Sequence, residues 1–294
     1  MNIKSALILS AGHGTRMGEI GKLIPKPLMP LFEKTLLEYH VLSLQKLGIE
    51  KIFINTHHLS DQIKNFHGLK KFKDVKLIEE RELLDVGGGV LNAINEHKLN
   101  GNMLVTLSDM LFMYDTHLLT MLESGLEHAN FSLLGMKIGP NENYNRLVLN
   151  PNGKLEAINE NNSNEFTYSG VSILNTNEIK RPTKKIKFFG DLIPLDGKSA
   201  WVCTQDKREF YDFGKAGDYI RSHLKLLQIA KSNKDDNLVR FLFENSFILD
   251  NKITQNLGYG FESGLDLGKV QVFIKNDLLA QLNFDKITQD IMLS

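Results

Sequence analysis

The hydrophobic pattern of the first half of the chain alternates between short apolar runs and longer stretches whose apolar residues recur at helical spacing. It predicts strands at 3–10, 51–55, 75–79 and 103–107, and helices at 36–47, 59–66, 89–96 and 116–125. Strands that alternate with helices are typical of a parallel, wound sheet whose two faces are both covered. The pattern therefore predicts an α/β fold with a Rossmann-like, mostly parallel mixed sheet flanked by helices.

The pattern changes after residue 130. Between Asn130 and Leu174, apolar segments are separated by turns rich in Asn, Gly and Pro, which predicts hairpins added to the sheet. A helical pattern returns from Ala216 to Ile229. We therefore predict a main domain at 1–230 and a C-terminal appendage at 231–294, made of a helix and short strands. So short a piece cannot easily form its own stable core, so we expect it to pack on the main domain or another subunit and to serve stability or assembly.

Composition and charge narrow the classes of function. Lys+Arg and Asp+Glu both number 35, so the formal net charge is zero and nothing indicates a protein that grips nucleic acid or an anionic membrane. Cys203 is the only cysteine, which excludes an intrachain disulfide framework and a multi-cysteine zinc site. The first apolar run is too short for a secretory signal, and no stretch approaches the roughly 20 apolar residues that span a bilayer. We therefore expect a cytosolic protein with a small-molecule partner.

The strongest chemical signal is the run LSAGHGTRM at 9–17, followed by PKPLMP. A buried strand ends here in a loop with two glycines, Gly12 and Gly14, whose backbone N–H groups can approach a ligand closely. Arg16 adds a forked cation suited to phosphate oxygens, and Lys26 lies between two prolines that predict an extended, stiff backbone. Two fixed cations beside a glycine loop indicate a polyphosphate cradle.

The alternative is an ordinary surface turn with solvated charges. The loop is neither a P-loop nor a dinucleotide fingerprint, because G-x-x-x-x-G-K-[ST] is absent and Gly14 is not followed by glycine three residues on. The combination of the loop with PKPLMP after a strand favours the functional interpretation.

SAGHGTRM and PKPLMP resemble the signature of the sugar-1-phosphate nucleotidyltransferases, the NDP-sugar pyrophosphorylases, and the resemblance extends to about residue 228. Residues 82–89 and 166–171 look most like the branch of N-acetylmuramate-1-phosphate uridylyltransferases and mannose-1-phosphate guanylyltransferase-like proteins. The resemblance implies a fold of the nucleotide-diphospho-sugar transferase type, with 1–230 as the catalytic domain. It also implies Mg²⁺-dependent transfer from an NTP to a sugar 1-phosphate, which gives pyrophosphate and an NDP-sugar precursor of cell-envelope polysaccharide.

The resemblance further implies roles for individual residues. Arg16 would hold the leaving β- and γ-phosphates, and Lys26 the phosphate oxygens near the reacting centre. The implied nucleotide-binding set is Ala11, Gly12, Gly14, Thr15, Arg16, Gly87 and Gly88. The implied sugar-binding set is Glu160, Ser169 and Gly170, although the lysine that follows such a glutamate in many relatives is absent here. The residues by themselves leave other roles open, because the two glycines at 87–88 suit a tight strand-to-helix turn and 169–170 suit a half-exposed strand.

Two aspartates are candidate Mg²⁺ ligands. Asp109 follows the buried strand MLVTLS at its carboxyl end, where ligands bind in wound α/β sheets. Mg²⁺ is usually held by one or two carboxylates plus substrate phosphates. The resemblance implies that Asp109 binds the metal and that Asp212 is the second carboxylate, although the chain has Lys215 and Ala216 where Thr-Pro is common in the family. A helix cap, the alternative role, fits Asp115 better, because a predicted helix follows it directly.

Two other functions stay open. One is cytidylyl transfer to a phospho-alcohol such as phosphocholine, and the other is a catalytically silent regulatory subunit on the same fold. The presence of both cations and both aspartates argues against the silent subunit. The expected partners are an NTP and a sugar 1-phosphate, without nucleic acid or membrane, and the resemblance leaves open whether the chain forms a homo-oligomer.

Overall fold

The structure is a computed structural model that describes residues 2–72, 74–140, 142–159, 165–205 and 210–248. The chain divides into two compact units, each built from two separated segments. The first comprises Met1–Gly12 and His40–Phe210, and the second comprises His13–Tyr39 and the chain from Tyr211 onward. Most of the predicted appendage lies outside the described residues, so the predicted boundary at residue 230 stays a prediction.

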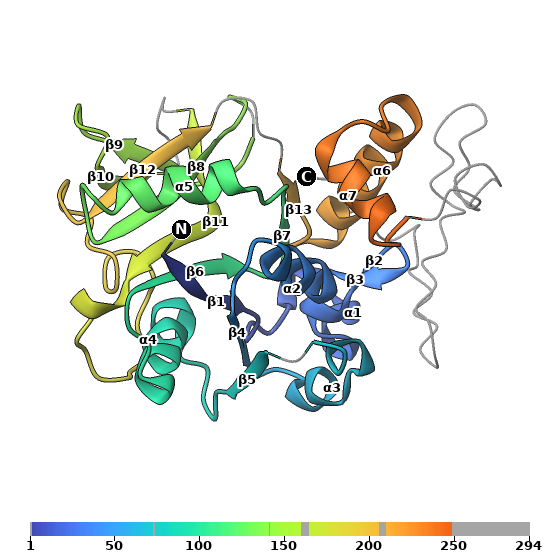
Figure 1. Ribbon diagram of the computed structural model, residues 1–294, viewed down its shortest axis with the longest axis horizontal. Coiled ribbons are helices and arrows are strands. Elements are labelled where there is room, and N and C mark those ends of the chain that lie inside the picture. Colours follow the sequence, from blue (N-terminus) through green and yellow to red (C-terminus); the bar gives the residue numbers. More distant parts are fainter. Residues whose placement is uncertain (1, 73, 141, 160–164, 206–209, 249–294) are drawn as a thin grey trace. The chain divides into compact units, whose positions relative to one another are not determined.

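In the described part of the first unit, nine strands form one mixed sheet with the order β10-β9-β11-β6-β1-β4-β5, and β8 and β12 continue from β11 (Figure 1). The strands β5, β4, β1 and β6 run parallel to one another, while β11 is antiparallel to β6, β8 and β9. This arrangement confirms the predicted wound, mostly parallel mixed sheet. The bounds are β1 Ile3–Leu9, β4 Lys51–Thr56, β5 Val75–Glu79, β6 Asn102–Leu107, β8 Phe131–Lys137, β9 Arg146–Leu149, β10 Leu155–Asn159, β11 Phe166–Asn175 and β12 Ala200–Gln205.

The central strand β1 owes its position to its nearly continuous apolar sequence. Only Lys4 of its seven residues is exposed. Leu7 lies opposite Phe53 of β4 and Val105 of β6, and all three side chains are buried. A strand that is apolar on both faces is stable only where both faces are covered, which places it in the middle of the sheet.

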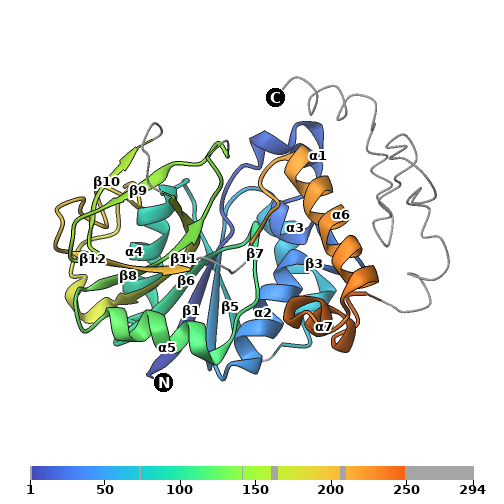
Figure 2. The same cartoon turned by 90° about the horizontal axis from the view of Figure 1, so that it is seen from above.

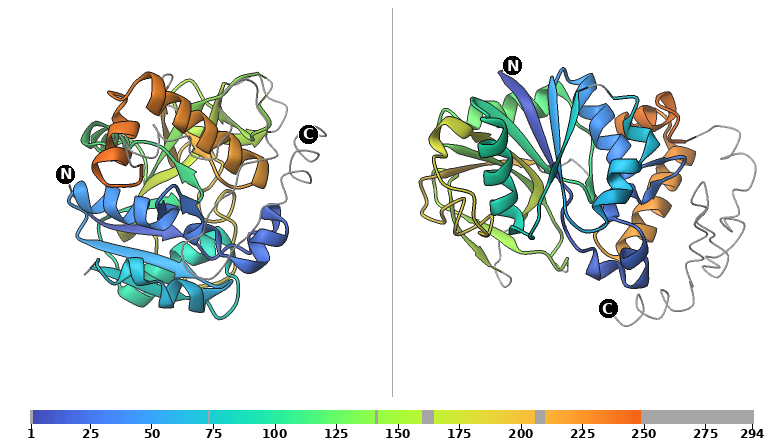
Figure 3. Two further views of the ribbon diagram at one scale, coloured as in Figure 1. Left: turned by 90° about the vertical axis from the view of Figure 1, so that its right-hand side faces the viewer. Right: turned by 90° about the horizontal axis from the view of Figure 1, so that it is seen from below.

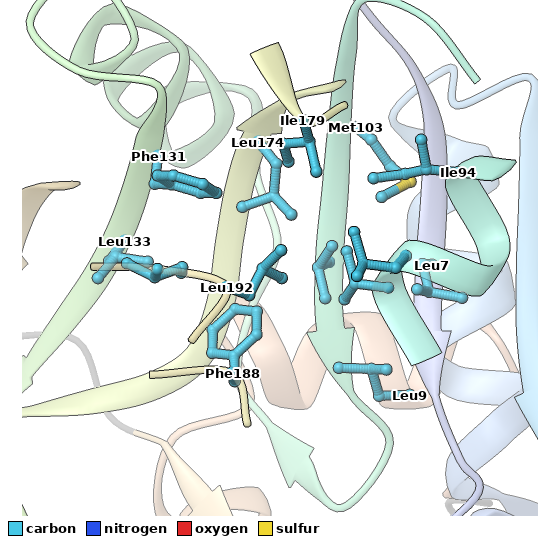
Figure 4. Close-up of a cluster of buried hydrophobic side chains, with 14 of the residues drawn as sticks. Leu7, Leu9, Ile94, Met103, Phe131, Leu133, Leu174, Ile179, Phe188 and Leu192 are labelled. Carbon is cyan, nitrogen blue, oxygen red and sulfur yellow. The ribbon is translucent and has the colours of Figure 1, made fainter. Parts of the chain in front are cut away.

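Helices cover both faces of this sheet. Helix α4 (Asp85–His97) packs its buried side chains against Leu7 and Leu9, in the apolar cluster that Figure 4 shows. Helix α5 (Thr116–Gly125) contacts Ser132 of β8, whose two neighbours along the strand point into the α4 cluster. Because successive side chains of a strand point to opposite faces, α4 and α5 lie on opposite sides of the sheet (Figure 2). The other elements of this unit are α3 (Ser60–Asn65), β7 (Met110–Leu111) and the 3-10 turns His67–Leu69 and Thr176–Glu178.

The second unit is mainly helical. Its elements are α1 (Glu19–Leu23), β2 (Pro30–Leu31), β3 (Lys34–Thr35), β13 (Tyr211–Asp212), α6 (Ala216–Ser232), α7 (Asn237–Glu244) and the 3-10 turns Thr15–Met17 and Lys26–Leu28. Helix α2 (Leu36–Lys46) begins in this unit and ends in the first, and α6 and α7 (orange in Figure 3) pack together.

The two segments of the second unit are joined by hydrogen bonds and aromatic contacts. The Tyr219 hydroxyl donates to the Pro30 carbonyl at 2.7 Å. The Tyr39 ring lies 5.4 Å from that of Phe241 in α7, and the Glu33 N–H donates to the Phe247 carbonyl at 3.0 Å. The described part of the predicted appendage therefore packs on residues 33–39, while residues 249–294 lie outside the described residues.

Most predicted elements are confirmed to within two residues, but three differ. Helix α4 begins at Asp85 rather than at Gly89, because its glycines are held in the helix by close packing that periodicity does not reveal. Strand β12 was not predicted and pairs in parallel with β8. Of the predicted hairpins, β9 and β10 form one, whereas β8 pairs with the more distant β11.

Candidate functional site

The carboxyl ends of four parallel strands meet at one edge of the first unit. The register places Leu9, the last residue of β1, opposite Asn55 of β4 and Leu107 of β6. Residues that follow these strands therefore lie side by side along the edge. In wound α/β sheets this edge is where ligands bind.

Ala11 and Gly12 extend from the end of β1. Ala11 is buried and Gly12 is exposed. A β-carbon built on Gly12 would meet no atom within 4 Å, so packing within the protein does not explain why this residue is glycine. The open backbone is consistent with the close approach of a ligand, as the sequence predicts.

Asp109 lies on the adjacent loop, directly after β6. The Ser108 N–H donates to the Leu9 carbonyl at 3.2 Å, which attaches this loop to the end of β1. Asp109 is half-buried. The structure therefore brings Asp109 and the loop at 11–12 to the same edge of the sheet.

A buried polar cluster lies behind the Asp109 loop. His40 Nδ1 lies 2.9 Å from the Tyr114 hydroxyl, which lies 2.7 Å from Thr106 Oγ1. Burial lowers the pKa of His40 to about 4, although the Ser108 backbone and the charge of Asp109 act in the opposite direction. His40 is therefore neutral at pH 7 and adds no positive charge beside Asp109.

Gly87 and Gly88 lie in the first turn of α4 and are buried. A β-carbon would lie 2.4 Å from the Lys187 carbonyl oxygen at Gly87 and 2.5 Å from the Lys184 carbonyl oxygen at Gly88. The Gly88 N–H also donates to the Ile186 carbonyl at 3.1 Å. Close backbone packing therefore explains both glycines without a ligand, and their predicted nucleotide role stays a prediction.

Ser169 and Gly170 lie at an irregularity in the pairing of β11 with β8, beside the carboxyl end of β6. Gly170 has a φ of 89°, in the left-handed region, and its α-carbon faces the Leu107 side chain. The Val171 N–H donates to Ser169 Oγ at 3.1 Å, and Ser169 is fully buried. The Ser169 hydroxyl thus stabilises the irregular backbone, while Glu160 lies outside the described residues.

The cations of the predicted cradle lie in the second unit. Gly14 has a φ of 67° and precedes the 3-10 turn Thr15–Met17, in which Thr15 and Arg16 are exposed. The stem of Lys26 packs against Gly14, with its Cγ 3.7 Å from the position of a β-carbon there. The structure thus brings the Lys26 stem to the glycine loop.

One expectation for the segment Pro25–Pro30 is wrong. The flanking residues Pro25 and Met29 are extended, with ψ of 137° and 140°. Lys26 itself begins a 3-10 turn, because the Leu28 and Met29 N–H groups donate to the Pro25 and Lys26 carbonyls. These local hydrogen bonds outweigh the preference of a residue before proline for extended backbone.

Asp212, in β13, has a fixed carboxylate. Its Oδ1 accepts from the Gly214 N–H at 2.6 Å, and its backbone carbonyl accepts from Ser222 Oγ of α6 at 2.8 Å. The side chain is half-buried.

A carboxylate is the kind of ligand that a hard cation takes from a protein, and a bound substrate can supply the remaining ligands. Within the described ranges, no group of three or more His, Cys, Asp or Glu is placed to hold a metal ion. Mg²⁺ is commonly held by one or two carboxylates and takes its remaining ligands from water and phosphate. Asp109, half-buried at the strand edge of the first unit, is a carboxylate of this kind, and the metal roles of Asp109 and Asp212 stay predictions.

Two polar residues at the same edge were missed by the sequence analysis. Asn55 and Glu80 are both 3% exposed and hydrogen-bond to each other. A polar residue at the end of the apolar run KIFIN is the signal that would have found Asn55. Glu80 gives no comparable signal, because it lies in a charged stretch.

The fold and this edge together define a wound α/β unit with the strand edge at which such sheets bind ligands. Residues 6–134 match the model of the MobA-like NTP transferase domain. A UTP–glucose-1-phosphate uridylyltransferase from Synechocystis sp. is 27% identical over 73% of this chain and 61% of its own length. A D-glycero-alpha-D-manno-heptose 1-phosphate guanylyltransferase from Aneurinibacillus thermoaerophilus is 26% identical over 75% of this chain and 97% of its own.

A solved structure has the same fold. HddC from Yersinia pseudotuberculosis, crystallised with GMP-PN, has a TM-score of 0.65 and 23% identity, covering 76% of this chain and 99% of HddC. Residues 6–134 are thus similar to the MobA-like NTP transferase domain, and the relatives confirm the resemblance of the chain to the sugar-1-phosphate nucleotidyltransferases. The chain spans less than two thirds of the length of several relatives. The relatives as a whole include both uridylyl and guanylyl transferases. The finer branch therefore stays a prediction. None of the described helices is long and apolar enough to cross a membrane.

Proposed function

We propose that this protein transfers a nucleotidyl group from an NTP to a sugar 1-phosphate. An oxygen of the sugar phosphate attacks the α-phosphorus in line, the bond from the α-phosphorus to the β-phosphate oxygen breaks, and pyrophosphate leaves. The products are an NDP-sugar and pyrophosphate. Such a reaction depends on positioning and charge neutralisation and needs no protein nucleophile.

The observation that best supports the proposal is that Gly12 and Asp109 lie at the same carboxyl edge of the sheet. Gly12 offers open backbone that packing does not require, and Asp109 follows the neighbouring strand. Both lie within the region that matches the NTP transferase model. An edge with an exposed glycine backbone and a carboxylate suits a nucleotide with a divalent cation.

Each residue has a proposed task. The backbone at Ala11–Gly12 reads the nucleobase, Arg16 holds the β- and γ-phosphates that leave, and Lys26 holds oxygens near the α-phosphorus. Asp109 and Asp212 are the proposed ligands of Mg²⁺, an assignment that rests on the sequence resemblance. When bound, Mg²⁺ neutralises charge on the phosphates. The base, the sugar, self-association and a cytosolic location stay predictions.

The experiment is a substrate panel on the full chain. The protein is incubated with Mg²⁺, each of the four NTPs and a set of sugar 1-phosphates, and pyrophosphate release is measured. We expect release that requires both substrates and is lost with EDTA. Release with phosphocholine and CTP alone would favour the alternative transferase. No release with any pair would overturn the proposal in favour of a silent subunit.

A further inference from the structure

A chain of three hydrogen bonds crosses the carboxyl edge of the first unit. The Ser10 N–H donates to Asn55 Oδ1 at 2.7 Å, and Asn55 Nδ2 donates to Glu80 Oε1 at 2.6 Å. Glu80 Oε2 then accepts from the Leu84 N–H at 3.1 Å. The two side chains thus join the residue before Ala11 to the residue before α4.

The chain is buried, and its carboxylate is held by dipoles alone. Asn55 and Glu80 are both 3% exposed, and among the described residues no Lys or Arg forms an ion pair with Glu80. A buried carboxylate without a cation is costly unless its oxygens are hydrogen-bonded. Both oxygens of Glu80 are hydrogen-bonded, so burial of this carboxylate is compensated without a cation.

Helix α4 packs closely on this Asn55–Glu80 bridge at Gly89, where a larger side chain would not fit. A β-carbon on Gly89 would lie 2.7 Å from both Asn55 Nδ2 and Glu80 Oε1. The helix therefore rests directly on the Asn55–Glu80 hydrogen bond. The loop beneath is held as well, because the Glu80 N–H donates to the Thr56 carbonyl at 2.8 Å.

We infer that Asn55 and Glu80 are positioning residues for nucleotidyl transfer, which fix the loop at Ala11–Gly12 relative to the start of α4. This inference rests on the proposed function. Neither side chain acts on the reacting atoms. They act through Ser10 and Leu84, so that the backbone that meets the nucleotide is in place before the nucleotide binds. Small displacements of such groups are enough to slow a reaction strongly.

The donors and acceptors allow a sharp test. In Glu80→Gln the side chain has only one oxygen, so it can accept from the Leu84 N–H or from Asn55 Nδ2 but not from both, and its NH₂ group then faces a second donor. In Asn55→Asp two carboxylates face each other at the same hydrogen bond. In the double variant Asn55→Asp/Glu80→Gln the middle bond reverses direction: residue 55 accepts from Ser10 and from the amide of residue 80, whose oxygen accepts from Leu84. All three hydrogen bonds are thereby restored.

The experiment compares the two single variants, the double variant and a matched control. Glu79→Gln is the control, because Glu79 is exposed, is adjacent in sequence and contacts Lys64 on the surface. We expect each single variant to raise KM for the NTP at least about tenfold, the double variant to return it to within about threefold of wild type, and the control to leave it unchanged. A double variant no better than the singles, or single variants with wild-type KM, would overturn the inference.

Amide hydrogen exchange separates this inference from the proposed function. The Ser10 and Leu84 amides should exchange faster in both single variants, and at the wild-type rate in the double variant and the control. If wild type releases no pyrophosphate but exchange follows this order, the proposed function fails and the bridge stands. If wild type is active but exchange at both amides is the same in all variants, the bridge fails alone.

Discussion

A β-carbon on Gly21 would lie 2.2 Å from the carbonyl oxygen of Gly14, so helix α1 and the glycine loop meet backbone to backbone. The same carbonyl accepts from the Met17 N–H at 2.9 Å and thereby closes the turn that carries Arg16. The conformation of the loop thus depends on a glycine seven residues after it, in a helix that carries none of the predicted site residues.

We expect Gly21→Ala to displace this loop. Overpacking at such a contact typically costs about 1–3 kcal/mol of unfolding free energy, and turnover should fall with it. Urea unfolding and pyrophosphate release measure the two effects. Gly12→Ala should leave the unfolding free energy nearly unchanged, because its β-carbon meets no atom within 4 Å. Equal destabilisation by both changes would contradict the packing argument.

Asp109 and Asp115 are two nearby aspartates with different expected roles, so one serves as the control for the other. We expect Asp109→Asn to remove nearly all turnover with little change in stability, because the neutral amide loses the charge that attracts Mg²⁺. Asp115 caps α5, with Oδ1 accepting from the Leu118 N–H at 2.7 Å. Asp115→Ala should therefore cost about 1 kcal/mol of unfolding free energy and keep its turnover. Near-normal turnover of Asp109→Asn would exclude Asp109 as the metal ligand.

The two cations should act on catalysis rather than on folding. Arg16→Ala and Lys26→Ala are each expected to lower kcat/KM at least about tenfold, which is roughly 1.4 kcal/mol of transition-state stabilisation. Lys26→Arg should rescue only in part, because a planar fork differs from a compact ammonium and because the Lys26 stem packs on Gly14. Lys22→Ala, an exposed change in α1, controls for loss of charge. Indifference to both alanine changes would mean that the phosphates bind elsewhere.

Acid should destabilise the protein through His223. Burial lowers the pKa of His223 from 6.5 to about 4, against the opposite effect of the Tyr219 and Pro30 carbonyls. Between these values the unfolded histidine binds a proton and the folded one does not, so the unfolding free energy should fall as pH drops from 6.5 to 4. The full effect of such a shift is about 3 kcal/mol. Urea unfolding at several pH values measures it, and His223→Gln should reduce the slope in part, because buried His40 has the same lowered pKa. An unchanged slope in that variant would assign the effect to other groups.

Local patterns predicted those parts of the fold that are determined locally. The strand 75–79 and the helix 116–125 were predicted with the observed bounds, because their apolar spacing and the Asp115 cap are visible in a short window. The start of α4 was not, because three glycines disfavour a helix and only distant contacts explain them. Gly87 and Gly88 pack on the backbone at 184–187, and Gly89 packs on Asn55 and Glu80. The Asn55–Glu80 bridge was also invisible, because it depends on the register of β4 against β1 and on a contact 25 residues apart. Among the predicted site residues, the register places the loop at 11–12 and Asp109 at the same edge of the sheet, and their roles stay predictions.

The second unit is built from two segments far apart in the sequence, so it can fold completely only after the second segment has been synthesised. Its first segment, His13–Tyr39, precedes its second by the 171 residues of 40–210. At ribosomal rates of about 5–20 residues per second, the first segment therefore waits roughly ten to thirty seconds before Tyr219 can reach the Pro30 carbonyl or Phe241 can reach Tyr39. During that interval Tyr39 is without Phe241 and Phe247, whose rings later pack against it. The nascent chain thus carries an apolar segment whose later partners have not yet been made, and Gly14, Arg16 and Lys26 belong to the unit whose folding is completed last.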